Sequence, residues 1–235
     1  MFFLKEVNAL PRNFLVGDST VDDNTPPFRG WGWALPEYVR EGVTVKNHAL
    51  SGESSRSFWG KGLFDPVREA MTGGDMLLVQ FGHNDEKDDE RHTDPASSFP
   101  RHLRIYIDAA RAKGALPVLI TPVARRFFTA DGGILYTHGE YPAAIRALAQ
   151  AEGVPLCDLK ADSRALYLKG GPDKTAELFV RLKPGEHPDF PDGHDDKTHF
   201  CAEGAKVIAG LVARELWAHP ACRGFINPPE GEKDA

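Results

Sequence analysis

The sequence predicts a single α/β domain in which helices cover both faces of a parallel β-sheet. Short apolar runs, each followed by turn residues, alternate along the chain with segments whose apolar residues recur at helical spacing. The 235-residue length and the 41% hydrophobic content suit one domain with a substantial core. We therefore expect residues 1–235 to form one domain, with its core between about residues 13 and 217.

Five apolar runs are expected to form the strands of this sheet. The run at 75–81 is the clearest, because it is apolar without alternation, as in a strand buried on both faces. Shorter runs of the same kind predict the remaining strands at 13–16, 43–48, 116–121 and 154–157.

The segments between these runs predict helices and loops. One helix is expected at 33–40, and apolar stripes of period 3.6 predict three more, around 103–110, 141–148 and 205–216. Polar, glycine-rich or proline-rich composition indicates loops at 85–100, 125–138 and 183–196. The tail at 220–235 is expected to be frayed.

Charge and composition exclude several classes of partner. The net charge of −6 and the lack of a Lys/Arg-rich run argue against nucleic acid. A long polyanionic substrate would also be repelled, unless the cleft is locally basic. No stretch approaches the roughly 20 apolar residues of a membrane span. The apolar patch at 1–6 is interrupted by charge and lacks the apolar core of a signal peptide, so we expect a soluble, cytoplasmic protein. No pattern sets the oligomeric state.

Cysteine usage is sparse. Cys157, Cys201 and Cys222 form neither a disulfide framework nor a metal-binding knuckle. Buried thiols are the favoured interpretation, since free cysteine is among the most buried residue types, and a Cys201–Cys222 pair is the alternative.

Four short segments carry polar residues that we expect to meet at one edge of the sheet. Ser19, Gly52 and Asn84 follow the first, second and third predicted strands. The carboxyl ends of parallel strands open on the same edge, where the sites of such sheets lie. Asp196 and His199 precede the last helix, which can pack back beside the first strand.

These five residues match the requirements of acyl transfer to a serine. Ser19 supplies a hydroxyl nucleophile, His199 a general base, and Asp196 a carboxylate that orients the imidazole. The backbone N–H groups of Ser19 and Gly52 and the side-chain amide of Asn84 supply an oxyanion hole. Each residue alone has an ordinary structural use, as a helix cap or a turn residue. The set as a whole predicts a serine esterase.

In order and residue type, the four segments resemble those of the SGNH (GDSL) hydrolases, and within them the rhamnogalacturonan acetylesterase branch, from about residue 13 to 217. This resemblance implies a flavodoxin-like three-layer sandwich with a five-stranded parallel sheet, and no cofactor or metal. It also implies removal of O-acetyl groups from pectic or xylan oligosaccharides, with a small acetylated saccharide as substrate. The branch's second block usually reads Gly-Arg-Ser-x-Arg-Ser-Phe. Here Glu53 replaces the first arginine, which weakens the inference of a uronate-rich substrate.

Candidates for substrate contact, and two alternative functions, complete the sequence reading. His83, Trp31 and Trp59 lie near the site segments, although core packing is the commoner use of such tryptophans. The first alternative is a metal-dependent phosphoesterase, because 17–22 fits a Gly-Asp-x-x-Asp pattern and several acids and histidines could be ligands: His83, Asp85, His187, His194 and His199. The second is a non-catalytic carbohydrate-binding protein.

Overall fold

The computed structural model describes residues 10–232 and contains the predicted five-stranded parallel sheet, with strand order β2-β1-β3-β4-β5. The apolar patch at 1–6 lies outside the described residues. Each strand falls within two residues of its predicted position: β1 (Arg12–Gly17), β2 (Thr44–Asn47), β3 (Met76–Gln80), β4 (Leu116–Ile120) and β5 (Leu156–Cys157).

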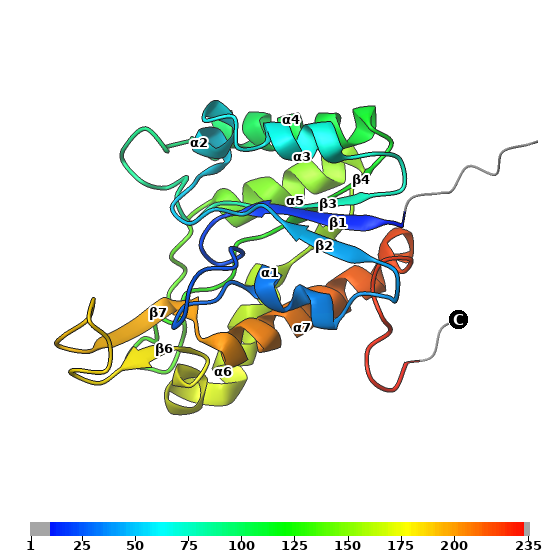
Figure 1. Ribbon diagram of the computed structural model, residues 1–235. Helices are drawn as coiled ribbons and strands as arrows, with labels where there is room; N and C mark the ends of the chain where they lie inside the picture. Colours follow the sequence, from blue (N-terminus) through cyan, green and yellow to red (C-terminus); the bar gives the residue numbers. More distant parts are fainter. Residues whose placement is uncertain (1–9, 233–235) are drawn as a thin grey trace, which may run out of the picture.

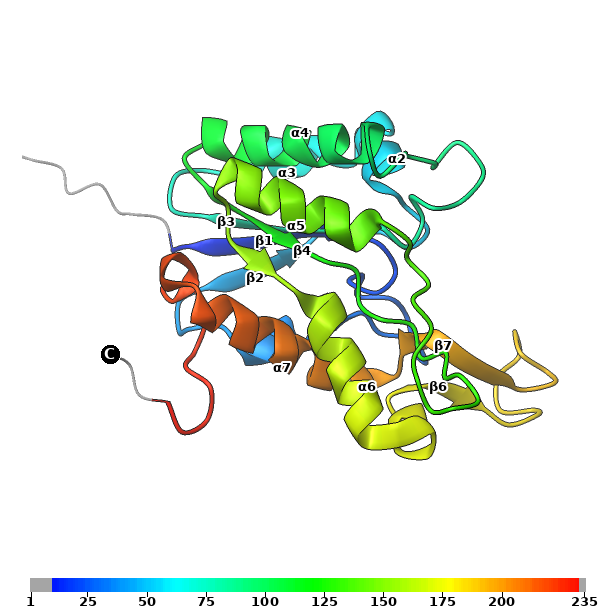
Figure 2. The same ribbon diagram turned by 180° about the vertical axis from the view of Figure 1, so that it is seen from behind.

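Two layers of helices cover the sheet, as Figures 1 and 2 show. One face carries α2 (Ser55–Gly60), α3 (Asp65–Ala70), α4 (Ser98–Ala112) and α5 (Tyr141–Glu152). The other carries α1 (Trp31–Ala34), α6 (Leu159–Ala176) and α7 (Ala202–Ala218). The three apolar stripes are confirmed as α4, α5 and α7. No apolar stripe in the sequence predicts α6, because this helix is weakly amphipathic and is broken by Gly171 (φ +73°) and Pro172.

The helix predicted at 33–40 is wrong in its bounds. α1 begins at Trp31 and is followed by a 3-10 turn, η1 (Leu35–Glu37). The start is fixed by the strand-end turn, because Trp31 N donates to Thr20 O (2.8 Å) and Gly32 N donates to Val21 O (3.1 Å). The element is short because Pro36, within η1, cannot donate a helical hydrogen bond.

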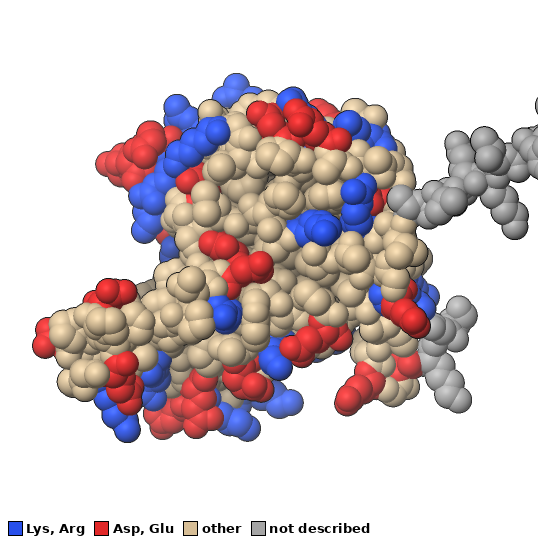
Figure 3. Space-filling view, viewed as in Figure 1, with Lys and Arg blue, Asp and Glu red and all other residues tan. Residues whose placement is uncertain are grey.

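The sheet separates two hydrophobic clusters, and β1 contributes to both. Leu15 packs in the cluster beneath α1 and α7, while Phe14 and Val16 pack in the cluster beneath α4 and α5. Alternate residues of β1 point to opposite faces, so a strand buried on both sides is apolar throughout. On the outer face shown in Figure 3, Lys and Arg are interspersed with Asp and Glu, and no continuous basic stripe crosses it.

The expected fraying from residue 220 is wrong for the described part of the tail. A 3-10 turn, η2 (Pro220–Cys222), leads to Ile226, which is fully buried and bridges to Val39. Asn227 N also donates to Tyr38 O (2.9 Å). Residues 233–235 lie outside the described residues.

An antiparallel hairpin of β6 (Phe179–Leu182) and β7 (His194–Phe200) lies outside the main sheet, on the side where the parallel strands end (Figure 1). The loop predicted at 183–196 is therefore shorter, because its last three residues belong to β7. All three cysteines are free, with Cys157 and Cys222 buried and Cys201 partly exposed. Within residues 10–232, no helix is both long enough and apolar enough to cross a membrane.

Candidate active site

Ser19 lies in a tight turn that directly follows β1. The buried carboxylate of Asp18 shapes this turn, because its Oδ1 accepts hydrogen bonds from Thr20 N (2.9 Å) and Thr20 Oγ1 (2.8 Å). Asn24 Nδ2 donates to Ser19 O (2.8 Å) and holds the turn from outside. The Ser19 hydroxyl bonds to an imidazole and caps no helix, so the capping use weighed from the sequence does not apply.

Ser19, His199 and Asp196 form a continuous chain of hydrogen bonds. Ser19 Oγ lies 3.0 Å from His199 Nε2, and His199 Nδ1 lies 2.9 Å from Asp196 Oδ2. A carboxylate only accepts hydrogen bonds, so Nδ1 carries the proton and Nε2 is free to accept from the serine. Asp196 Oδ1 accepts the backbone N–H groups of Thr198 (2.7 Å) and His199 (2.9 Å).

The electrostatics of this chain favour an ionised Asp196. Burial alone would raise the pKa of this carboxyl group, but the hydrogen bonds from the His199 ring and N–H, together with that from His194, lower it well below its usual range. His194 Nε2 lies 3.0 Å from the same oxygen that accepts His199 Nδ1–H. This second imidazole on Asp196 is absent from the predicted catalytic set, where His194 is only a candidate ligand of the metal alternative.

Three candidate oxyanion donors line one cleft of about 470 Å³ together with His199: Ser19, Gly52 and Asn84. The backbone N–H groups of Ser19 and Gly52 donate to none of residues 10–232. Gly52 adopts φ +84°, a conformation that favours glycine. Asn84 is 9% exposed, and its Nδ2 donates to Glu53 O (3.0 Å), which fixes the amide.

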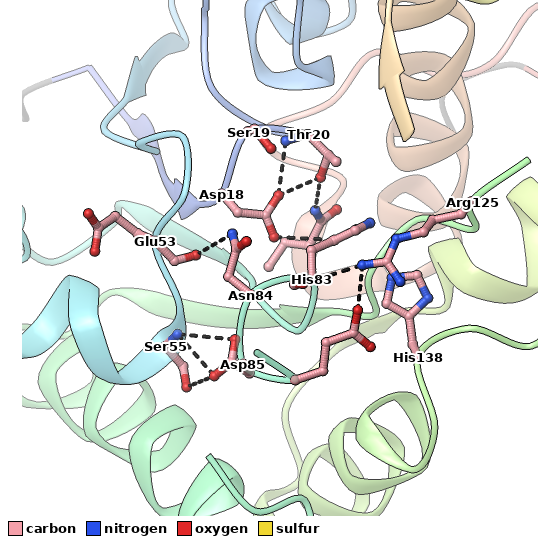
Figure 4. Close-up of polar contacts among 12 residues, drawn as sticks. Asp18, Ser19, Thr20, Glu53, Ser55, His83, Asn84, Asp85, Arg125 and His138 are labelled. Carbon is pink, nitrogen blue, oxygen red and sulfur yellow. Dashed lines mark hydrogen bonds and ion pairs between the residues drawn. The ribbon is translucent and has the colours of Figure 1, made fainter. Parts of the chain in front are cut away.

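Glu53 does not place its charge in the site. Its carbonyl faces Asn84, whereas its carboxylate points away (Figure 4). The side chain is buried, where Oε1 pairs with Lys61 Nζ (2.7 Å) and Oε2 accepts from Ser57 Oγ (2.5 Å). The Glu53 carboxylate therefore does not stand beside the candidate oxyanion donors, and this residue gives no reason to exclude a uronate-rich substrate.

His83 links the nucleophile turn to the Asn84 turn. Both His83 and Asp18 are buried, and His83 Nδ1 lies 3.3 Å from Asp18 Oδ2 (Figure 4). Burial lowers the pKa of His83, which keeps the imidazole neutral near pH 7. His83 is only 4% exposed, but it lines a second cleft that contains Ser19, so its contact with a substrate stays a prediction.

Asp85 anchors the other end of the Asn84 turn. It accepts hydrogen bonds from the N–H and the hydroxyl of Ser55 and from Thr93 Oγ1 (3.0 Å). Burial nevertheless raises the pKa of Asp85 to about 6. Its carboxylate is thus held by the protein and does not project toward a substrate.

The two tryptophan candidates do not line the site. Trp31 is fully buried, and its Nε1 donates to Gln80 Oε1 (2.9 Å), so it packs beneath the end of β3 and lines no cleft that contains Ser19. Trp59 is partly buried against Phe64 and lines neither of the clefts that contain Ser19. The aromatic wall of the cleft is instead made by Phe28 and Phe190, which were missed because no spacing or motif marks them.

The donor set of the metal alternative is dispersed. Asp18 is engaged with Thr20 and His83, and Asp22 Oδ2 accepts from the Ser51 hydroxyl (2.8 Å). Within residues 10–232, no group of three or more His, Cys, Asp or Glu side chains converges as metal ligands do.

The chain is similar to known proteins over most of its length. A model of the GDSL-like lipase/acylhydrolase family matches residues 15–207. Rhamnogalacturonan acetylesterase RhgT of Bacillus subtilis is 48% identical over 206 residues, which cover 86% of this chain and 88% of that protein.

Solved structures share the fold. The crystal structure of Bacillus subtilis YxiM has a TM-score of 0.77 at 30% identity; the match covers 88% of this chain but only 56% of that one. Axe2, an acetylxylan esterase of Geobacillus stearothermophilus, has a TM-score of 0.57 at 16% identity, with 88% and 95% covered. At that identity the likeness is one of fold alone.

Proposed function

The chain belongs to the GDSL-like lipase/acylhydrolase family, and we propose that Ser19, His199 and Asp196 are its catalytic triad. The activity is that of a carbohydrate acetylesterase, a carboxylic ester hydrolase that removes O-acetyl groups from cell-wall-derived oligosaccharides. The observation that carries the residue assignment is the unbroken chain from Ser19 Oγ through His199 to Asp196, at 3.0 and 2.9 Å.

The first half of the reaction forms an acetyl-enzyme. As Ser19 Oγ attacks the carbonyl carbon of the acetyl ester, its proton passes to His199 Nε2. The carbonyl oxygen becomes an oxyanion, which the Gly52 and Ser19 N–H groups and the Asn84 amide stabilise. When the tetrahedral intermediate collapses, the C–O bond to the sugar breaks. His199 then gives the proton to the leaving sugar oxygen.

The second half releases acetate by the same route. Water gives a proton to His199 Nε2 while its oxygen attacks the acetyl carbon bound to Ser19 Oγ. The same donors hold the second oxyanion. On collapse, the proton returns to Ser19 Oγ and acetic acid leaves, which ionises to acetate in solution. Asp196 stays ionised throughout, orients the ring and stabilises the imidazolium.

The test is acetate release from 4-nitrophenyl acetate and from acetylated xylo- and pectic oligosaccharides, in EDTA. We expect wild-type activity to persist in EDTA and Ser19→Ala to lose several orders of magnitude in kcat. Ser97→Ala, an exposed serine beside α4, is the matched control and should keep wild-type rates. Activity that EDTA abolishes and Ser19→Ala retains would instead favour the metal-dependent phosphoesterase. Sugar binding without ester turnover would favour the non-catalytic binding protein.

A further inference from the structure

The carboxylate of Asp196 accepts hydrogen bonds from two imidazoles, and the proposed reaction uses only one of them. His199 Nδ1 and His194 Nε2 lie 2.9 Å and 3.0 Å from the same oxygen, Oδ2. His194 and Asp196 are two residues apart on β7, so their side chains leave the same face of the strand. An ionised carboxylate only accepts hydrogen bonds, so His194 donates to Oδ2 from Nε2–H. The strand therefore supplies a second donor to the group that orients the proposed base.

Within residues 10–232, four N–H groups hold Asp196, two on each oxygen. Oδ1 accepts from the backbone N–H groups of Thr198 (2.7 Å) and His199 (2.9 Å), and Oδ2 accepts from the two imidazoles. The backbone fixes Oδ1, whereas the position of Oδ2 depends on side chains. In the proposed reaction the His199 ring gains and loses a proton on Nε2, while His194 exchanges none. His194 is thus the constant side-chain donor on Oδ2.

Aromatic packing holds His194 against the carboxylate. Its ring centre lies 4.5 Å from that of Phe190, with 33° between the planes, and 6.0 Å from that of Phe28. Phe28 also meets the His199 ring edge-on, with centres 5.9 Å apart. The His194 side chain is 30% exposed and that of Asp196 only 11%. A hydrogen bond to a charged group in so sheltered a place is stronger than the same bond in water.

We propose that His194 is a positioning residue for catalysis, which fixes Asp196 Oδ2 and thereby keeps the His199 ring in line with Ser19. This inference rests on the proposed triad. Without the His194 donor, His199 alone holds Oδ2, and carboxylate and ring can drift together away from the serine hydroxyl. Small displacements of a catalytic group cost rate and not binding, so the effect falls on kcat.

The experiment compares two replacements of His194 in the hydrolysis of 4-nitrophenyl acetate. His194→Gln keeps an N–H donor near the place of Nε2 but has no ring, whereas His194→Phe keeps a ring but has no donor. For His194→Phe we expect kcat to fall about 10-fold, as the loss of a hydrogen bond to a charged group implies, with KM within about twofold of wild type. For His194→Gln we expect kcat within about threefold of wild type, because the donor is restored. Thermal unfolding of the same samples shows that each variant is folded.

Proton NMR of the His199 Nδ1–H gives a readout that a purely structural role would not change. A proton shared between an imidazole nitrogen and a carboxylate resonates far downfield of ordinary amide protons. Because both imidazoles donate to one oxygen, loss of the His194 donor alters the bond that Oδ2 makes to His199. We therefore expect this signal to move or broaden in His194→Phe and to stay near its wild-type position in His194→Gln.

His102→Phe is the matched control. His102 lies on α4, where its Nδ1 is 2.8 Å from Ser98 O of the same helix, and it lines neither of the two clefts that contain Ser19. This variant should change neither kcat nor the His199 signal. A folded His194→Phe with wild-type kcat and an unmoved signal would overturn the positioning role. Equal losses of kcat in the Gln and Phe variants would also overturn it, and so would a change confined to KM, since His194 lines the larger cleft as well.

Failure of the proposed function would give a different pattern. If wild type releases no acetate from 4-nitrophenyl acetate, or if Ser19→Ala stays active, the triad itself is wrong, whatever the His194 variants do. If wild type is active, Ser19→Ala is inactive and His194→Phe is unaffected, the triad stands and only the role of His194 is refuted.

Discussion

The Asn84 amide offers the sharpest test of the oxyanion hole. Asn84→Ala removes one of three donors without touching the nucleophile or the base, so we expect kcat to fall about 100- to 1,000-fold, or about 2.7–4 kcal/mol of transition-state stabilisation. KM should change little, because the donor acts on charge that develops after binding. The lost bond to Glu53 O costs about 0.5–1.5 kcal/mol of folding free energy, which leaves the variant folded.

The assay is steady-state hydrolysis of 4-nitrophenyl acetate, with thermal unfolding measured on the same samples. Asn84→Asp is the informative companion, since it keeps the size of the side chain but replaces the N–H donor with an acceptor. It should be at least as inactive as Asn84→Ala if the amide donates to the oxyanion. Folded Asn84→Ala protein that retains kcat within threefold of wild type would refute the reasoning, as would an active Asn84→Asp.

Three further predictions concern the base and the frame that carries the site. Asp196→Asn should lower kcat roughly 1,000- to 10,000-fold, because an amide does not enforce the His199 tautomer with its proton on Nδ1. Steady-state hydrolysis of 4-nitrophenyl acetate at pH 7–8 checks this. Burial raises the pKa of Asp85 to about 6, above its unfolded value of about 3.9, so the stability this group contributes is present below pH 4 and is lost as pH rises through 6. We therefore expect the free energy of unfolding of Asp85→Asn, relative to that of wild type, to rise by up to about 3 kcal/mol between pH 4 and pH 7. Urea unfolding of both proteins at each pH checks this. Gly204→Ala should cost roughly 3 kcal/mol or more, since its Cβ would lie 1.8 Å from Leu178 O, whereas Gly60→Ala, with nothing within 4 Å, should melt near wild type.

Most of the sheet, and the meeting of the candidate site residues, could be predicted because both follow from local sequence patterns. A strand covered on both faces must be apolar throughout, so β3 is visible in the sequence as a continuous run. Residues that follow successive parallel strands share an edge, so the convergence of Ser19, Gly52 and Asn84 on one cleft follows from their positions alone.

The remainder depends on tertiary contacts that leave no local trace. β7 reads His-Asp-Asp-Lys-Thr-His-Phe, a polar run with no strand signature, and it is a strand only because β6 pairs with it. The orientation of Glu53 depends on Lys61 and Ser57, neither of which a motif reveals. Phe28 and Phe190 are distant in the sequence and become one wall only when the hairpin is in place, with ring centres 5.8 Å apart.

The proposed catalytic residues are divided between two structural supports. Ser19 and Asn84 lie at strand ends of the buried sheet, whereas Asp196 and His199 are carried by a hairpin outside it. The hairpin is tied to the body by backbone bonds from Arg29 N to Phe200 O (2.9 Å) and from Arg126 N to Lys197 O (2.8 Å). The second tie holds the segment that follows β4 beside the strand that carries His199. Changes in the 183–193 loop, which carries Phe190, can therefore reshape the aromatic wall while Ser19, Gly52 and Asn84 keep their geometry.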